Sequence, residues 1–326
     1  MKFLLVRFSA IGDCVMAAQA ATSVRRACPD AFIAWAVESR CAAVVSSRPS
    51  PPNPLSPGAG EGELVDLRYE FPRDRWRSSR WSPVTWWDSL RTYSGLRKHR
   101  FDFGLDLQGH SKTALCLYLA KPKRRLAAQA TDSLAKRLNP VAAGDPGSIH
   151  VVEWNHLVLS QLGDFPAIDR PMMPSLESER ARVIPLLGPT PDRIATISTG
   201  AGALDKQWLI ERWMSVGEAL EERGFAVSYL GGPTDPHPSQ GGDLVGRLPL
   251  NETMAAVKAS AIHLCSDTGT GHIAAAYGVP VVSVFGPTDP ARYRPWTDRG
   301  RVLRNGRETS GTSVEDVLAA VDSLLA

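Results

Sequence analysis

The sequence predicts an α/β protein built from two consecutive doubly wound halves, each with a parallel sheet. Three observations lead to this fold class. Short apolar segments alternate with segments whose apolar residues recur at helical spacing, this alternation starts again near residue 193, and a proline-rich segment at 171–192 separates the two series. Alternating strands and helices form βαβ units with parallel strands. With 326 residues the chain can hold two cores, and we place the domains at residues 1–175 and 185–326.

The first half begins with a βαβ unit. The apolar run at 3–8 predicts a strand, residues 12–28 predict a helix that Pro29 ends, and residues 31–38 predict the next strand. Further along, FDFGLDLQG predicts a strand that enters a glycine turn, and SKTALCLYLA predicts the helix after it. Residues 46–63 are rich in proline, glycine and serine and have little to bury, so we expect a disordered surface insertion there.

The second half repeats this pattern. Strands are predicted by RIATIST, FAVSYLGG, AIHLCSD and VPVVSVFG, and helices by WLIERWMSVGEALEERG, NETMAAVKAS, GHIAAAYG and SVEDVLAAVDSLLA. Gly224 is a natural end for the first of these helices, and Ser313 with Asp316 forms a capping box at the start of the last. Packing of that C-terminal helix back on the first domain is one option that the sequence leaves open. The 171–192 segment suits a linker with a short helix in it.

The composition argues against several classes of protein. A net charge of +3 and a pI near 8.6 do not indicate bulk nucleic-acid binding. Arg7 ends the first apolar run and Asp13 follows, which is too short a core for a signal peptide, and no run of about 18 apolar residues suits a membrane span. We therefore expect a cytoplasmic protein. Five cysteines without a CxxC pair favour buried reduced thiols over zinc or disulfides.

Doubly wound folds bind ligands at the carboxyl ends of their strands and in the cleft between domains, so polar residues that follow strands are candidates for a site. Asp13 follows the first strand and opens the first helix. It could complement the helix macrodipole, or it could lie at the mouth of the cleft and accept a proton from a substrate hydroxyl. Gly12 beside it allows close approach to the backbone.

Two glycine-rich turns of the second half favour anion binding. Lys206 lies in STGAGALDKQW, where it could be a solvated surface lysine or could bring a cation to a phosphate together with backbone N–H groups. Asp267 ends a strand, and residues 268–271 form a turn before the next helix, where a diphosphate would be stabilised. His272 can donate to the same oxygens. The structural alternative is an N-cap at Asp267 or Thr268 and a satisfied surface histidine.

The same turn also resembles a dinucleotide-binding fingerprint. Gly269, Gly271 and Ala274 have the required spacing, and Asp289 stands about 20 residues further on. An NAD(P)-dependent oxidoreductase is therefore an alternative. The position of this fingerprint near the end of the chain, and of Asp289 in a Pro-Thr-Asp-Pro loop, speaks against it.

Residues 71–90 combine four tryptophans with four arginines. Arginine matches phosphate oxygens, and tryptophan favours the headgroup zone of a membrane, so an anionic amphiphilic substrate is one interpretation. A loop and helix packed on the domain, with solvated arginines, is the other. The basic run KPKRR at 121–125 could add attraction to anionic lipid.

Together these segments resemble glycosyltransferase family 9, the ADP-heptose:lipopolysaccharide heptosyltransferases. The likeness lies in residues 4–38 and 101–120, in DKQW and in CSDTGTGHIAAAYGVPVVSVFGPTDP, and it covers nearly the whole chain apart from the insertion. It implies a GT-B fold, in which two Rossmann-like domains face each other across a cleft, the first binding the acceptor and the second the nucleotide sugar. It further implies transfer of heptose from ADP-heptose to an inner-core acceptor of the Kdo-lipid A type, with inversion and without a metal or cofactor.

The resemblance also implies roles for individual residues. Asp13 would be the general base, and Lys206 would stabilise the departing ADP. Donor binding is assigned to a set in the second half: Gly202, Asp235, Leu248, Asp267, Thr268, Gly269 and His272. Acceptor binding is assigned to a set in the first half: Gly12, Arg73, Arg75, Arg77, Gln108, Gly109 and Lys112.

The partners implied are a nucleotide-sugar donor, a lipid-linked anionic saccharide and, transiently, the inner leaflet of the cytoplasmic membrane, but no nucleic acid. Three alternatives stay open. They are a family 9 transferase with another nucleotide sugar or acceptor, the oxidoreductase, and a binding protein that keeps the nucleotide site without turnover.

Overall fold

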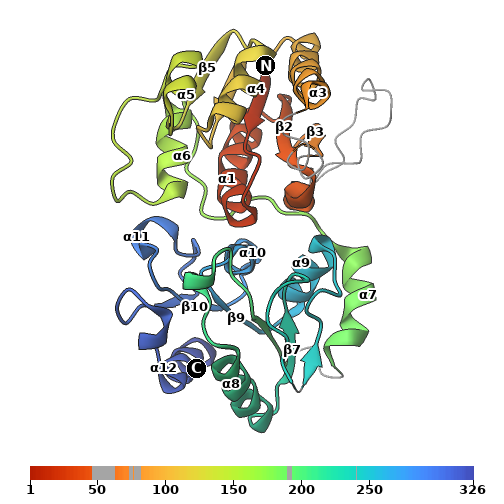
Figure 1. Ribbon diagram of the computed structural model, residues 1–326, viewed down its shortest axis with the longest axis vertical. Helices are drawn as coiled ribbons and strands as arrows, with labels where there is room; N and C mark the ends of the chain where they lie inside the picture. Colours follow the sequence, from red (N-terminus) through yellow and green to blue (C-terminus); the bar gives the residue numbers. More distant parts are fainter. Residues whose placement is uncertain (46–62, 73–75, 77–81, 189–192, 240) are drawn as a thin grey trace. The chain divides into compact units, whose positions relative to one another are not determined.

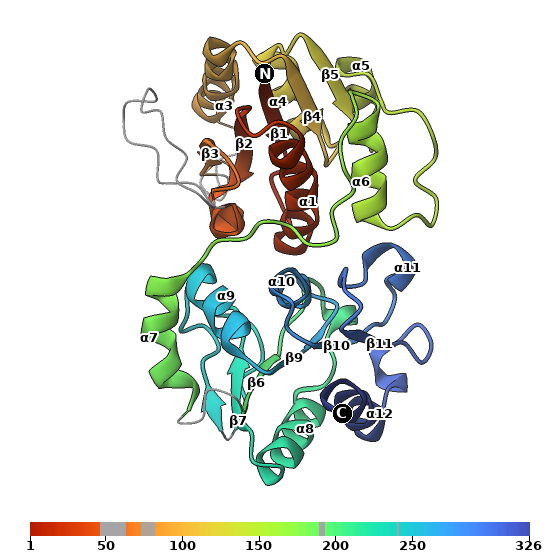
Figure 2. The ribbon, with the colours of Figure 1, turned by 180° about the vertical axis from the view of Figure 1, so that it is seen from behind.

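The computed structural model describes residues 1–45, 63–72, 76, 82–188, 193–239 and 241–326. The chain forms two compact units, Met1–Pro174 and Ser175–Ala326, which are drawn in Figure 1 and from behind in Figure 2. The second unit begins before residue 185 because α7 (Glu177–Leu187) packs on α9 (Leu250–Ala259). Except for its last residue, the insertion expected at 46–63 lies outside the described residues.

The first unit contains a five-stranded parallel sheet in the order β3-β2-β1-β4-β5. Its strands are β1 (Lys2–Val6), β2 (Phe32–Glu38), β3 (Leu67–Phe71), β4 (Phe103–Asp106) and β5 (Arg124–Ala127). Its helices include α1 (Ile11–Ala27), α3 (Pro83–Gly95), α4 (Ser111–Ala120), α5 (Ser133–Leu138) and α6 (Val151–Ser160), with 3-10 turns η1 (Ser39–Val44) and η2 (Leu96–His99).

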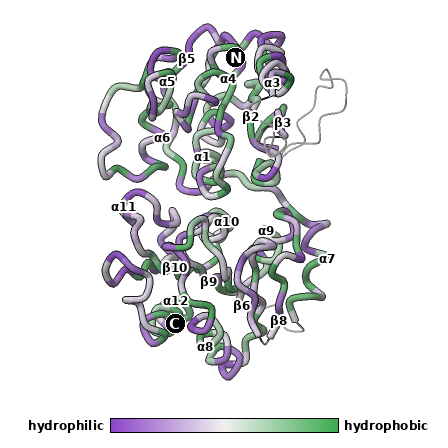
Figure 3. The backbone as a smooth tube through the Cα atoms, in the orientation of Figure 1, coloured by the Kyte–Doolittle hydropathy of each residue, from purple (hydrophilic) through white to green (hydrophobic). Residues whose placement is uncertain are grey.

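Helices cover both faces of this sheet. α1 packs against α6, and α4 packs against α3 and α5. Because successive side chains of a strand point to opposite faces, Leu4 and Val6 of β1 share a core with Leu117 of α4, whereas Phe3 packs edge-on against Phe165. Hydrophobic residues, green in Figure 3, recur along the strands of both units.

The second unit contains a six-stranded parallel sheet in the order β11-β10-β9-β6-β7-β8. Its strands are β6 (Ile194–Ser198), β7 (Ala226–Leu230), β8 (Gly242–Asp243), β9 (Ile262–Ser266), β10 (Val281–Val284) and β11 (Gly300–Leu303). Its remaining helices are α8 (Ile210–Glu222), α10 (Gly269–Tyr277), α11 (Pro290–Tyr293) and α12 (Val314–Leu325), with 3-10 turns η4 (Leu204–Lys206) and η5 (Thr309–Gly311). Numbered within the unit, the strand order is the Rossmann order 3-2-1-4-5-6 read from β8.

The predicted helix ends of the second half are confirmed. Gly224 follows α8 with a φ of 82° and donates its N–H to the Glu221 carbonyl at 2.8 Å, and Ser313 and Asp316 form the capping box of α12. The sequence left open whether α12 packs on the first domain. Its apolar face, which includes Val317 and Val321, lies in the core of the second unit with α8.

Of the five cysteines, Cys28 is half-buried and the other four are buried. Among the residues that the structure describes, no helix is both long and apolar enough to cross a bilayer.

Candidate active site

Both sheets have a switch point, where the strand order reverses, between their first and fourth strands. In the first unit this point lies between β1 and β4, and in the second between β6 and β9. Loops at the carboxyl ends of such a strand pair diverge and leave a crevice for a ligand. Asp13 follows β1, Gln108 follows β4, Lys206 follows β6 and Asp267 follows β9, so the residues selected from the sequence come together at the two switch points.

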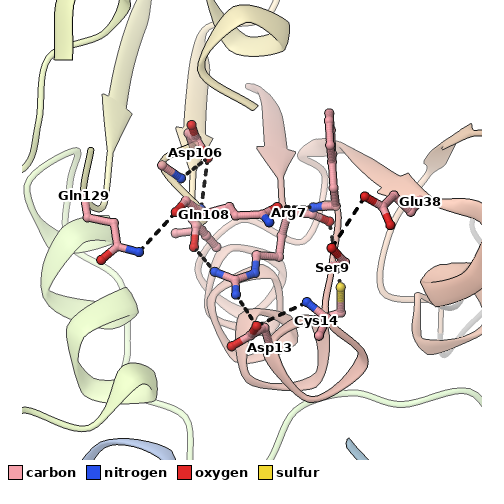
Figure 4. Close-up of polar contacts among 12 residues, drawn as sticks. Arg7, Ser9, Asp13, Cys14, Glu38, Asp106, Gln108 and Gln129 are labelled. Atoms are coloured by element: carbon pink, nitrogen blue, oxygen red, sulfur yellow. Dashed lines mark hydrogen bonds and ion pairs between the residues drawn. The ribbon is translucent and has the colours of Figure 1, made fainter. Parts of the chain in front are cut away.

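Asp13 is held by the first turn of α1 and by an arginine. Its Oδ2 accepts the N–H of Ala10 at 3.2 Å and lies 2.5 Å from Nη2 of Arg7 (Figure 4). The acid therefore does complement the helix start, and it is also one half of an ion pair. The Asp13 side chain remains 27% exposed, so the oriented carboxylate can still meet a substrate group.

Arg7 was not among the residues selected from the sequence. Its Nη1 donates to the Leu107 carbonyl next to β4, and its own carbonyl accepts the indole N–H of Trp35 at 3.1 Å. The side chain of Arg7 thus connects the end of β1 to the end of β4, and its backbone carbonyl connects β1 to β2. The available signal was a cation inside the apolar run at 3–8, where an unpaired charge would cost several kcal/mol.

The turn after β4 is built around Asp106. Its Oδ1 accepts the N–H groups of Gln108 and Gly109, both at 2.9 Å, and burial raises the pKa of this carboxyl group to about 6. Gly109 has a φ of +78°, and a Cβ there would overlap the carbonyl of Gln129, so only glycine fits. The side-chain oxygen of Gln108 accepts the Phe8 N–H at 3.0 Å, which braces the two strand ends against each other.

Lys112 lies beside a buried acid that the sequence interpretation missed. Glu38, at the end of β2, is buried; its carboxylate is 2.9 Å from Nε of Arg40 and 3.7 Å from Nζ of Lys112. One acid thus faces two cations. Gly12 is buried in the first turn of α1. The other acceptor residues named from the sequence, Arg73, Arg75 and Arg77, lie outside the described residues.

In the second unit Lys206 is paired and is not a solvated surface lysine. Its Nζ lies 2.8 Å from Oδ2 of Asp267, although 61 residues separate the two in sequence. Asp267 directly follows β9, and Lys206 ends the turn η4 after β6. The pair therefore stands at the switch point of the second sheet.

The amino end of α10 adjoins this pair. Thr268 is the N-cap with extended backbone, and the hydroxyl of Thr270 donates to Ser198 at the end of β6 at 2.8 Å. His272, predicted to be a diphosphate ligand, is buried in the first turns of the helix. The first amides of a helix have no acceptor within it, and they carry a partial positive charge, so an anion at this position would be stabilised.

The loops after β6, β7 and β8 carry the other donor candidates. The Asp235 carboxylate accepts the Gly232 N–H at 2.7 Å and lies against Gly200, where a Cβ would overlap it. Gly202 faces open space, and Leu248 is half-buried just before α9. Since these strands are adjacent and parallel, their loops share the carboxyl edge that holds Lys206.

Asp289, the acid of the dinucleotide-like pattern, caps a helix. Asp289 is the N-cap of α11, and its Oδ1 accepts the N–H of Ala291 at 3.0 Å. A ribose-binding acid would instead need to present its carboxylate at the end of a strand.

Comparison with known proteins agrees with this geometry. The model of glycosyltransferase family 9 (heptosyltransferase) matches residues 89–319, well over half of the chain. Lipopolysaccharide heptosyltransferase 1 of Pseudomonas aeruginosa is 27% identical over 313 residues, with 89% of this chain and 80% of that protein covered. Lipopolysaccharide heptosyltransferase 3 of Escherichia coli K12 is 29% identical over 208 residues, with 54% and 60% covered.

Solved structures show the same fold. A glycosyltransferase family 9 protein from Veillonella parvula superimposes with a TM-score of 0.81 at 17% identity, over 99% of this chain and 97% of that chain. The E. coli heptosyltransferase WaaC with ADP gives a TM-score of 0.78 at 20% identity, over 99% and 100%. Two Rossmann-like units of this kind make up the GT-B fold, and the family match decides against the oxidoreductase alternative. The chain belongs to glycosyltransferase family 9 and is a glycosyltransferase.

Proposed function

We propose that the chain transfers heptose from ADP-heptose to a lipopolysaccharide inner-core acceptor of the Kdo-lipid A type. The observation that carries this proposal is the Lys206–Asp267 pair beside the amino end of α10, at the switch point of the second sheet. The names of the relatives support the reaction, since they are lipopolysaccharide heptosyltransferases, and WaaC has been solved with ADP and with ADP-2-deoxy-2-fluoro heptose.

In this proposal the diphosphate of the donor lies at the amino end of α10. Negative charge grows on the ADP oxygen as its bond to the sugar breaks. Lys206, the amides near Thr268 and Gly269, and His272 would stabilise that charge without a metal ion. Donors held in place before the reaction are the most effective kind, because they need no reorganisation when charge develops.

Asp13 would act as the general base. Its carboxylate takes the proton of an acceptor hydroxyl while that oxygen attacks the anomeric carbon, and the bond to ADP breaks on the opposite face, so the configuration inverts in one step. Arg7 positions the carboxylate. Its Nη2 lies 2.5 Å from Oδ2 of Asp13, so Oδ1 is the oxygen that would reach a substrate.

The acceptor is proposed to bind at the turn of Gln108 and Gly109 and at Lys112, and the arginines at 73, 75 and 77 would add charge for a phosphorylated saccharide. The resemblance to the family implies an acceptor at the inner leaflet of the cytoplasmic membrane. We therefore propose a cytoplasmic enzyme that touches this surface transiently.

The test is transfer by Asp13→Asn, with Asp30→Asn as a control at an exposed acid near the end of α1. Asparagine keeps the contacts to Ala10 and Arg7 but takes no proton, so we expect transfer from ADP-heptose to fall by a factor of about 10² to 10⁴. ADP affinity, measured by calorimetry, should not change, and a chelator should have no effect on the wild type.

If Asp13→Asn transfers heptose within about a factor of 3 of Asp30→Asn, Asp13 is not the base. A panel of ADP-, UDP- and GDP-sugars distinguishes the remaining alternatives. Transfer from another sugar would show a different donor, and ADP binding without any transfer would show a binding protein.

A further inference from the structure

A pocket of about 380 Å³ opens in the first unit between α3, α4 and α5. We propose that it binds an acyl chain of the acceptor, with the anionic end of the lipid at Lys112. This inference rests on the proposed lipid-linked acceptor and adds a lipid subsite to it. The volume lies in the range of small-molecule sites, which are mostly apolar clefts with a few polar groups.

Aromatic rings form a rigid floor. Trp76 stacks on Phe71 at a centroid distance of 5.7 Å, and Tyr93 meets both rings edge-on, at 5.2 Å from Phe71 and 5.9 Å from Trp76. The indole N–H of Trp76 donates to Asp88 of α3 at 3.0 Å, which fixes the orientation of the ring. The pocket is therefore shaped before any ligand arrives, and binding does not have to order its walls.

Helix α3 presents an apolar surface to solvent at the mouth of the pocket. Within this fully described helix Tyr93 alone is buried, whereas Trp86 and Leu90, which also line the pocket, are exposed. Leu134 of α5, 48% exposed, closes the other side. Exposed apolar groups of this size that rim an apolar pocket mark a binding surface, and tryptophan is typical of the zone where acyl chains meet headgroups.

Polar groups line the pocket at the start of α4. They are Ser111 and Lys112, and the Lys112 ammonium group, whose side chain is 27% exposed, lies 3.7 Å from the Glu38 carboxylate. The nearby Asp132 carboxylate accepts backbone N–H groups from the first turns of both α4 and α5. An apolar groove with a cation at one end suits an anionic amphiphile.

The polar residues of the pocket follow the proposed acceptor turn closely in sequence. Lys112 comes three residues after Gly109, and β4 lies beside β1, whose loop carries Asp13. A lipid whose chain lies between α3 and α4 thus has its headgroup directed to the carboxyl edge of the first sheet, where the base is expected.

The test uses alkyl phosphates of about four to about twelve carbons at concentrations below micelle formation. Binding is followed by calorimetry and by the fluorescence of the tryptophans at the pocket. Each methylene group that leaves water should lower Kd by a factor of about 4, until the chain fills the pocket and the gain stops. If Kd is independent of chain length, the proposal is wrong.

Leu134→Asp and Leu157→Asp form a matched pair for the location of binding. Both leucines are about half exposed, 48% and 45%, but Leu134 lines the pocket and Leu157 lies on α6. We expect Leu134→Asp to weaken binding of the longest alkyl phosphate by a factor of about 10 or more, and Leu157→Asp to leave it unchanged. If both variants weaken alkyl phosphate binding equally, the assignment is wrong. It is also wrong if sedimentation shows a dimer that Leu134→Asp alone dissociates, because a second copy of the chain would then fill the groove.

Transfer kinetics separate this inference from the proposed function. With an acylated and a deacylated acceptor, Leu134→Asp should raise KM for the first and leave KM for the second unchanged. Alkyl phosphate binding with the expected dependence on chain length, but without heptose transfer to any acceptor, would refute the proposed function and leave the lipid pocket intact.

Discussion

The ion pair of Lys206 and Asp267 allows a stringent test of the donor site by a double-mutant cycle. The two charged atoms are 2.8 Å apart, and the side chains are 31% and 8% exposed. At an effective dielectric constant of about 20 the attraction at this distance is about 6 kcal/mol, much of which offsets the desolvation of the two ions. Breaking a buried ion pair lowers the free energy of unfolding by about 3 to 5 kcal/mol, and losing an exposed pair lowers it by about 0 to 1 kcal/mol. Because water reaches Lys206, we expect Lys206→Met to lower the free energy of unfolding by about 1 to 3 kcal/mol.

The double variant Lys206→Met with Asp267→Asn separates stability from catalysis. It removes the charge that the single variant leaves unpaired, so urea unfolding should show most of the lost stability restored. Transfer should stay slow by a factor of about 10² to 10³, because both variants lack the cation that we propose stabilises departing ADP. If the double variant regains transfer, or if Lys206→Met loses stability but keeps its kcat, Lys206 is structural and the donor mechanism is wrong.

Two further predictions concern the supports of the site. Because burial raises the pKa of Asp106 to about 6, ionisation of this carboxyl group opposes folding. As the pH rises from about 4 to about 6, the free energy of unfolding of the wild type should fall by up to about 3 kcal/mol relative to that of Asp106→Asn. A constant difference between the two proteins in urea titrations across this pH range would contradict this prediction. Gly200→Ala should displace Asp235 and weaken ADP binding by a factor of about 10 in calorimetry, whereas Gly95→Ala, at a position with open space, should bind ADP as the wild type does. Equal ADP affinities of these two variants would remove Asp235 from the donor site.

The elements predicted from the sequence are those with a strong local pattern. SKTALCLYLA predicts a helix where α4 spans Ser111–Ala120, and the central strands β1, β6 and β9 lie in segments that were predicted to be strands. The strands that were not predicted lie at or next to sheet edges: β3, β5, β8 and β11. Strand β5 begins with two arginines, and β8 has two residues. Such segments become strands through pairing with a neighbour, a tertiary effect that the apolar periodicity of the segment itself does not contain.

The same distinction holds for the site. Position after a strand was enough to select Asp13, Lys206 and Asp267, because topology alone brings the carboxyl ends of parallel strands together. It did not show which side chains pair. Arg7 and Glu38 were missed, although both are charges at the ends of apolar strands and could have been recognised by that signal. Gln108 was selected for the acceptor, and the contact of its amide oxygen with the Phe8 N–H could not be predicted from its position after a strand.

Each unit thus has one carboxylate–cation pair at its switch point, yet the two pairs suit different tasks. The Asp13 side chain is 27% exposed, and Arg7 is the buried member of the pair. The carboxylate is therefore the group that solvent reaches, and the guanidinium group holds it in place. In the second unit the order is reversed, because Asp267 is 8% exposed and Lys206 is the accessible member. A general base must present an anion to a hydroxyl, and a leaving diphosphate must meet a cation. The opposite polarity of the two pairs therefore supports the proposed roles, in which Asp13 would deprotonate the acceptor and Lys206 would stabilise ADP.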